Sequence, residues 1–163
     1  MPEGGADLTL LLDRMRVGEL KGLNVTLPHK EMVVDKLDRL TPTAEKIGAV
    51  NTIFLEGTEL VGDNTDQEGF LLDLQKSLAP KRGNALVLGA GGAARAVVSG
   101  LMDSGWRVWV AARRLSHAEK LAEALRQSAT MLISPMSLDP KALIGVAPEL
   151  GLIVNATSVG MSP

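Results

Sequence analysis

The apolar and polar positions of the first forty residues follow two different periods. Between Asp7 and Met15 the apolar residues recur every three or four positions, which predicts a helix. The stretch Leu23–Leu27 alternates strictly, which predicts a strand with its three apolar side chains on one face. A turn is expected at Pro28–Lys30, and the apolar spacing over Val33–Leu40 predicts a second helix.

Turn-forming residues divide the next stretch into short elements. Thr41–Gly48 predicts a short helix with Thr at the N-cap, Pro at the first helical position and Gly at the end. Residues 50–55 and 59–61 predict a β-hairpin. The polar loop Gly62–Asp66 follows, and then a helix from about residue 67 to 78.

The second half of the chain alternates strands with helices. Strands are expected at 84–88, 106–111, 130–133 and 151–155, and helices at 92–104 and 116–127. This alternation predicts right-handed crossovers and a parallel sheet. The Pro- and Gly-containing segment Ala79–Gly83 predicts a boundary between domains 1–80 and 81–163. The predicted class is α/β: a partial N-terminal α/β domain, then a partial Rossmann-type domain with about four strands where about six are usual.

A glycine-rich turn joins the first of these parallel strands to its helix. Gly89, Ala90, Gly91, Gly92 and Ala93 allow the backbone to turn tightly and a bulky group to approach it. Unpaired N–H groups at a helix start, beside residues without side chains, suit a pyrophosphate. The third glycine of the common dinucleotide motif is an alanine here, and such turns also occur with no ligand.

Two arginines end the second predicted strand of the Rossmann-type domain, at the position that selects the dinucleotide. An acidic residue there binds the ribose of NAD, whereas arginine accommodates the 2′-phosphate of NADP. Arg113 and Arg114 occupy the position, and the next acidic residue is Glu119. Both could instead be solvated surface arginines, but their distance from the glycine turn favours NADP.

Composition narrows the remaining classes of function. A net charge of −2 and an aromatic content of 2% offer neither the charge nor the stacking platforms that nucleic acid requires. The sequence has no cysteine, and His29 and His117 lack metal-motif spacing. No apolar run approaches the roughly 18 residues of a membrane span, and the first residues do not resemble a signal peptide. We expect a cytoplasmic protein without a metal, nucleic-acid or membrane partner.

Several stretches resemble the shikimate dehydrogenase family in order and spacing. They are Gly22-Leu-Asn-Val-Thr-Leu-Pro-His-Lys30, Gly48-Ala-Val-Asn-Thr52, Gly62-Asp-Asn-Thr-Asp66, the glycine turn with Arg113, and Asn155-Ala-Thr-Ser-Val-Gly-Met161. The resemblance implies NADPH-dependent reduction of 3-dehydroshikimate to shikimate, in aromatic amino acid (chorismate) biosynthesis. It also implies an N-terminal substrate-binding and catalytic domain, a C-terminal NADP-binding Rossmann domain and a site in the cleft between them.

The resemblance assigns roles to four residues of the first domain. Lys30 matches the catalytic lysine and Asp66 the aspartate paired with it, while Thr26 and Asn51 match substrate-binding positions. An ammonium group can donate a proton and stabilise negative charge on oxygen, as ketone reduction requires. Taken singly, Lys30 could equally be a solvated lysine, Asp66 a helix N-cap and Asn51 a residue that hydrogen-bonds the backbone.

The resemblance also assigns the dinucleotide contacts. The turn Gly89–Ala93 matches the phosphate-binding turn, and Arg113 matches an arginine that contacts the adenosine 2′-phosphate. The family usually has Asn-Arg-Thr where this chain has Ala112-Arg113-Arg114, and His117 replaces an arginine. One polar contact is therefore lost and a second cation is gained, and NADP remains the expected cofactor.

The resemblance further implies segments that this sequence does not contain. The family has an earlier strand with a His-Ser-x-Ser-Pro signature and a C-terminal portion that completes the Rossmann sheet. We therefore interpret the chain as an internal fragment, and a homodimer is left open for the complete protein. Two alternatives remain: a quinate/shikimate dehydrogenase with broader cofactor use, and a non-catalytic nucleotide-binding module.

Overall fold

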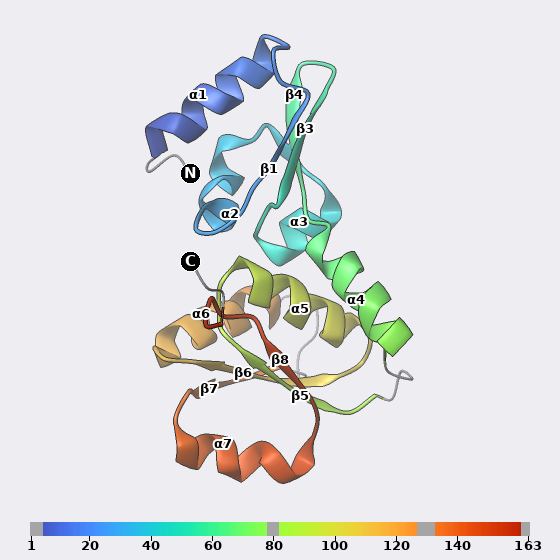
Figure 1. Cartoon of the computed structure of the whole chain (residues 1–163), viewed down its shortest axis with the longest axis vertical. Coiled ribbons are helices and arrows are strands. Elements are labelled where there is room, and N and C mark those ends of the chain that lie inside the picture. The colour runs from blue at the N-terminus through green and yellow to red at the C-terminus, as the bar shows by residue number, and fades with distance from the viewer. Residues whose placement is uncertain (1–4, 78–81, 127–132, 161–163) are drawn as a thin grey trace. The chain divides into compact units, whose positions relative to one another are not determined.

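The computed structural model describes residues 5–77, 82–126 and 133–160, which form two compact units, Met1–Thr65 and Asp66–Pro163 (Figure 1). Each unit has its own four-stranded sheet and hydrophobic core. The predicted α/β class, with a parallel sheet in the second half, is confirmed. The predicted boundary at residue 80 lies outside the described residues and stays a prediction.

The first unit is a mixed sheet with short helices. Its helical elements are α1 (Gly5–Arg16), α2 (His29–Met32), the 3-10 turn η1 (Val34–Lys36) and α3 (Pro42–Ile47). Its strands are β1 (Gly22–Asn24), β2 (Arg39–Leu40), β3 (Thr52–Glu56) and β4 (Glu59–Asp63), in the order β1-β3-β4-β2. The predicted hairpin β3–β4 is antiparallel, whereas β2 pairs with β4 in parallel.

The caps of α3 form as the sequence predicts. The Thr41 hydroxyl accepts a hydrogen bond from the Ala44 N–H at 3.2 Å, with Pro42 at the first helical position. Gly48 ends the helix with a φ of 68°, in the left-handed region that favours glycine. The helix buries Ala44 and Ile47. Local capping chemistry therefore decides where this element starts and stops.

The predictions for residues 23–40 are partly wrong. The first strand ends at Asn24, because the Thr26 carbonyl turns back to accept the His29 N–H at 2.9 Å, and Leu27 is exposed rather than buried. The helix predicted over 33–40 is instead η1 followed by β2. The backbone here bonds to β4, with Asp38 N–H donating to the Leu60 carbonyl at 3.1 Å. Strand pairing therefore outweighs the local helical spacing.

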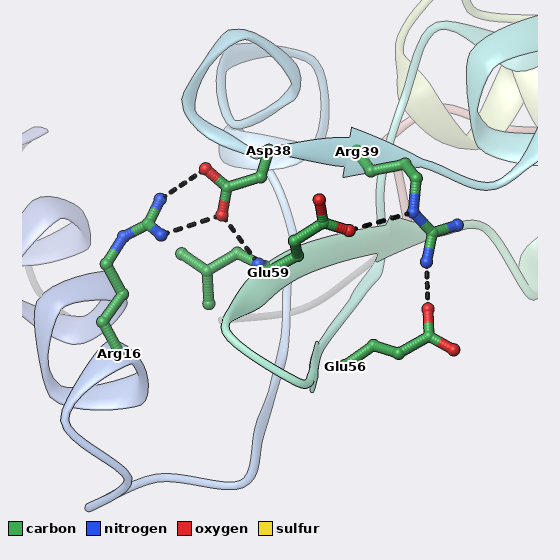
Figure 2. A network of polar contacts seen from close by, with 6 residues as sticks. Arg16, Asp38, Arg39, Glu56 and Glu59 are labelled. Carbon is green, nitrogen blue, oxygen red and sulfur yellow. Dashed lines mark hydrogen bonds and ion pairs between the residues drawn. The ribbon is translucent and has the colours of Figure 1, made fainter.

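Ion pairs connect α1 and β2 to the hairpin of the first unit (Figure 2). Arg16 donates two hydrogen bonds to Asp38, each 2.8 Å long, and the same carboxylate accepts the Leu60 N–H at 2.8 Å. Arg39 pairs with Glu56 and Glu59. The Arg16 guanidinium, followed by the Leu60 N–H, lowers the pKa of the Asp38 carboxyl below its usual range.

We predict that Asp38→Asn destabilises the chain near neutral pH and that this effect disappears in acid. A carboxylate whose pKa is lowered by folding stabilises the protein above its ordinary pKa of 3.8, and the contribution is lost as the pH falls through the folded pKa. Urea unfolding of both proteins from about pH 7 to pH 3 measures the difference.

The matched control is Asp35→Asn, which removes the same charge three residues earlier, where the side chain is exposed. Its stability difference from the wild type should be small at every pH. A difference for Asp38→Asn that is as large at pH 3 as at neutral pH would contradict the assignment.

The second unit is built on a parallel sheet. Its strands are β5 (Asn84–Leu88), β6 (Arg107–Ala112), β7 (Ile133–Ser137) and β8 (Leu150–Asn155), in the order β7-β6-β5-β8. Its helical elements are α4 (Asp66–Ser77), α5 (Gly92–Asp103), α6 (Leu115–Arg126), α7 (Pro140–Val146) and the 3-10 turn η2 (Ala147–Glu149). The pairs β5–β6, β5–β8 and β6–β7 are all parallel. The strand predicted at 130–133 shares only its last residue with β7, which continues to Ser137, and residues 130–132 lie outside the described residues.

Helices cover both faces of this sheet. Figure 1 shows α5 and α6 on one side and α7 on the other. The α5–α6 side contains the hydrophobic core, whose fully buried members include Val87, Val98, Leu101, Val108, Val110 and Leu121. Helix α4 packs against α5, where a Cβ at Gly100 would lie 3.2 Å from Gln67 and Leu71. Close packing of α4 on α5 therefore places α4 in the second unit.

Helix α7 was not predicted, although its start has a clear sequence signal. Asp139 caps it by accepting the N–H groups of Lys141 and Ala142, and Pro140 occupies the first helical position. The helix is only 7 residues long and buries none of its side chains. An element of about two turns is too short to show a clear helical period, so the cap is its clearest sequence signal.

Candidate functional site

The predicted glycine turn lies at the carboxyl end of β5, a central strand of the parallel sheet. The Gly89 N–H donates to the Ala111 carbonyl of β6 at 2.8 Å, and the Ala156 N–H, just after β8, donates to the Leu88 carbonyl at 2.9 Å. The turn is therefore attached to both neighbouring strands. The chain order reverses between β5 and β8, and ligands of such sheets bind at this switch point.

The first turn of α5 has the chemistry of an anion site. Gly91 is the N-cap residue, no side chain of the described residues caps the helix, and its first turn contains no acidic residue. A Cβ at Gly91 would meet no described atom within 4 Å. Uncapped N–H groups next to open space fit a pyrophosphate, because the helix dipole and the N–H groups both favour negative charge.

The backbone conformation at position 89 and the atoms around it leave room only for glycine. Its φ is 109°, and a Cβ there would lie 2.9 Å from the Ala156 carbonyl oxygen and 3.3 Å from Thr157. The loop after β8 has little room to retreat, since Asn155 Oδ1 accepts both the N–H and the hydroxyl of Thr157, at 3.0 and 2.7 Å. Gly89 is therefore required by backbone conformation and by close approach together.

The predicted arginines follow β6 directly. Arg113 and Arg114 lie between the end of β6 and the start of α6, and both are exposed. Ala111, two residues before Arg113, accepts the Gly89 N–H at 2.8 Å, so this end of β6 lies beside the glycine turn. The residues present therefore fit a dinucleotide whose ribose bears an extra phosphate, with the pyrophosphate at the turn and a cationic strand end next to it.

Lys30 is held in the first unit through its backbone. It lies in α2, a single turn that follows Pro28, and its side chain is half-buried. Its carbonyl accepts the Val50 N–H at 2.7 Å, which fixes α2 against the segment that precedes β3. Thr26 lies four residues earlier and is exposed.

Asn51 connects this segment to the loop that leads to Asp66. Its Nδ2 donates to the Thr65 hydroxyl at 3.0 Å, and its Oδ1 accepts the Thr65 N–H at 3.1 Å. The Asn51 N–H also donates to the Asp63 carbonyl at 3.0 Å. The Asn51 side chain therefore hydrogen-bonds the backbone, which is one of the two roles predicted for it from the sequence. Its contact with a substrate stays a prediction.

The predicted site residues are divided between the units. Thr26, Lys30 and Asn51 belong to the first unit, whereas Asp66 is the first residue of α4 in the second. A carboxylate in the first turn also interacts favourably with the helix dipole. The pairing of Lys30 with Asp66 spans the two units and stays a prediction.

Asn64 was missed by sequence reasoning. It is 2% exposed although it lies in a polar loop, and its Nδ2 donates to the Ala49 carbonyl at 2.9 Å. Its neighbour Asp63 accepts the Thr41 hydroxyl at 2.6 Å. The only sequence signal is the run of polar residues from Asp63 to Asp66, in which Asn64 resembles an ordinary loop residue.

The described part of the chain offers neither a metal-binding cluster nor a membrane-spanning helix. Among those residues, no group of three or more His, Cys, Asp or Glu side chains could hold a metal ion. None of the helices in the described ranges is long and apolar enough to cross a membrane.

Comparison with protein-family models matches both halves of the chain. Residues 5–53 match the shikimate dehydrogenase substrate binding domain, and residues 73–157 match the shikimate / quinate 5-dehydrogenase model. The chain belongs to the shikimate dehydrogenase family. The resemblance drawn from the sequence motifs is thereby confirmed.

Individual members of the shikimate dehydrogenase family are similar over nearly the whole chain. Shikimate dehydrogenase (NADP(+)) of Geobacter metallireducens is 42% identical over 159 residues, covering 95% of this chain and 56% of the relative. The Thermus thermophilus shikimate 5-dehydrogenase, solved with NADP(H) and shikimate, is 39% identical with a TM-score of 0.79, covering 96% of this chain and 55% of that one.

A quinate dehydrogenase is also similar. The Corynebacterium glutamicum enzyme, solved with NAD, is 31% identical with a TM-score of 0.83, covering 97% of this chain and 57% of that one. This chain spans about half the length of the curated relatives that it matches. Its relatives therefore include proteins solved with either dinucleotide.

We predict that Gly89→Ala destabilises this family member by about 2 kcal/mol or more. The residue must adopt a positive φ, which costs a non-glycine residue about 1–3 kcal/mol, and its Cβ meets the Ala156 carbonyl oxygen at 2.9 Å. Denaturant unfolding measures the loss of stability.

Gly91→Ala is the matched control, and its free energy of unfolding should be close to that of the wild type, because its Cβ has open space. Equal stability of the two variants would contradict the close approach at Gly89.

Proposed function

We propose that the protein containing this sequence is an NADP-dependent shikimate dehydrogenase, which reduces 3-dehydroshikimate to shikimate reversibly. The observation on which the proposal depends is the uncapped start of α5 at the switch point between β5 and β8, with Arg113 and Arg114 after the adjacent strand. Membership of the family, and relatives named shikimate dehydrogenase (NADP(+)), support the same activity. NADPH, when bound, supplies the hydride.

In the proposed mechanism the side chains of the chain provide the proton and the orientation. The ketone oxygen of the substrate gains negative charge as its carbon is reduced, and the Lys30 ammonium stabilises that charge and donates a proton to form the alcohol. Asp66 orients the Lys30 side chain. In the reverse direction the neutral amine of Lys30 accepts the hydroxyl proton. Thr26 and Asn51 hydrogen-bond the substrate.

Turnover with four substrate and cofactor pairs tests the proposal. Shikimate and quinate are each assayed with NADP and with NAD, using the longest natural protein that contains this sequence. Turnover highest with shikimate and NADP supports the proposal. Preference for quinate or NAD would favour the quinate/shikimate alternative, to which the similarity with the Corynebacterium glutamicum enzyme also points. Dinucleotide binding with no turnover of either substrate would favour a non-catalytic module.

We predict that Lys30→Ala lowers kcat by about 100-fold or more and changes the KM for shikimate little. General acid catalysis contributes about 10²–10⁴-fold, and its loss affects the transition state rather than substrate binding. Steady-state kinetics on the same natural protein measure both constants. Lys36→Ala, an exposed lysine of η1, is the control and should retain the wild-type kcat. Retention of kcat in Lys30→Ala would exclude Lys30 as the acid.

We predict that Arg113→Gln weakens NADP binding by about 10-fold or more and leaves NAD binding nearly unchanged. A hydrogen bond to a charged group contributes about 1.5–3 kcal/mol to binding. NAD has no 2′-phosphate, so its binding does not depend on this bond. Calorimetric titration with each dinucleotide measures the change. Arg107→Gln removes an exposed arginine at the opposite end of β6 and should bind both dinucleotides as the wild type does. Equal weakening for NAD and NADP would contradict a 2′-phosphate contact.

A further inference from the structure

The segment Ala49–Asn51 forms hydrogen bonds on two sides within the first unit. On one side the Val50 N–H donates to the Lys30 carbonyl at 2.7 Å. On the other side the Ala49 carbonyl accepts the Asn64 Nδ2 at 2.9 Å, and the Asn51 side chain bonds to Thr65 at 3.0 and 3.1 Å. We call these residues the 49–51 segment. It is the common partner of the lysine turn and of the loop that ends at Asp66.

Asn64 is the most constrained member of this arrangement. It is 2% exposed, and an amide buried in this way loses free energy unless it is hydrogen-bonded. Its backbone N–H donates to Asp63 Oδ1 at 2.8 Å, and the same oxygen accepts the Thr41 hydroxyl at 2.6 Å. The loop is therefore attached to α3 through Thr41 and to the 49–51 segment through Asn64. Asp66 is separated from Asn64 by a single residue.

We propose that Asn64 is a positioning residue for Lys30 and Asp66, because it holds, through the 49–51 segment, the lysine turn and the loop that continues into Asp66. The proposal rests on the proposed function, because it assigns Asn64 a role in the reaction of those two residues. The lysine turn and the loop share the 49–51 segment as hydrogen-bonded partner, and loss of the Asn64 bond leaves only the bonds of Asn51 to hold the loop there. Displacement of a catalytic group by about 1 Å can lower a rate about 100-fold.

The first variant, Asn64→Ala, removes the amide. We expect kcat to fall by about 10- to 100-fold at a temperature at which the natural protein is folded. The dissociation constant for NADP should stay unchanged, because the residues that fit the dinucleotide belong to the second unit. A purely structural role would lower the melting temperature without changing kcat of the folded enzyme.

The second variant, Asn64→Asp, keeps the shape of the side chain and makes its donor depend on pH. An ionised carboxylate only accepts hydrogen bonds, whereas a protonated carboxyl group can donate one to the Ala49 carbonyl. The ratio of its kcat to that of the wild type should therefore rise as the pH is lowered toward the range in which the introduced carboxyl group protonates. A ratio that is constant with pH would contradict donation to Ala49.

The matched control is Ser104→Ala, which removes a side-chain hydrogen bond to a backbone carbonyl elsewhere. The Ser104 hydroxyl donates to the Gly100 carbonyl at 2.9 Å, at the end of α5. Its loss should lower the melting temperature and leave kcat unchanged. A fall in kcat as large as that of Asn64→Ala would show that the assay reports general destabilisation.

Amide hydrogen exchange tests the positioning separately from the chemistry. In Asn64→Ala the N–H groups of Val50 and Thr65 should exchange about 10-fold faster or more, because both bond to or from residues of the 49–51 segment, which loses its bond to Asn64. Unchanged exchange at both groups would overturn the proposal. Faster exchange with a wild-type kcat would also overturn it, by separating the loop from the reaction. If the wild-type protein has no turnover, the proposed function is rejected. Faster exchange in Asn64→Ala would then still show that Asn64 holds the loop.

Discussion

The carboxyl ends of β5 and β8 approach each other so closely that position 89 has no room for a side chain. A Cβ at Gly89 would lie 2.9 Å from the Ala156 carbonyl oxygen, and the backbone there has a φ of 109°. The chain turns here at the end of β5, and α5 then begins at Gly91, which has no side chain with which to cap the helix. The uncapped helix start on which the proposed pyrophosphate site depends therefore lies directly beside this close approach of the two strands.

In the first unit, hydrogen bonds between loops add to the four-stranded sheet and hold the segments around the candidate site residues. Thr41 both caps the start of α3 and donates to Asp63, so one hydroxyl begins a helix and restrains the loop after β4. The 49–51 segment then connects that loop to the turn of Lys30. Site residues in loops need this kind of support, because a loop has no ladder of backbone hydrogen bonds of its own.

Prediction from the sequence succeeded where the local pattern and the tertiary packing agree. The elements from β5 to α6 form within a residue or two of the expected bounds, because each buries the face that its periodicity indicates. Residues 33–40 show the opposite case, since their helical spacing is outweighed by pairing of β2 with β4. Leu27 is exposed because the chain turns at Thr26 instead of continuing along β1.

The candidate site divides in the same way. Lys30, Asp66 and the glycine turn could be identified because their chemistry and spacing form recognisable motifs. Asn64 could not, because its burial and its bond to the Ala49 carbonyl, fifteen residues earlier in the chain, are seen only in the folded structure. No local pattern records a bond between distant residues.

By itself, then, the sequence determined which family the chain belongs to, the glycine turn of its parallel sheet and the two arginines after β6, since each is a local arrangement of residue types. Only the tertiary structure decided the strand order β7-β6-β5-β8, the strand at Arg39–Leu40 and the partners of Asn64 and Thr41. The physical reason is that hydrogen bonds and packing join residues far apart in the chain, and these contacts outweigh the weaker preferences of each local segment.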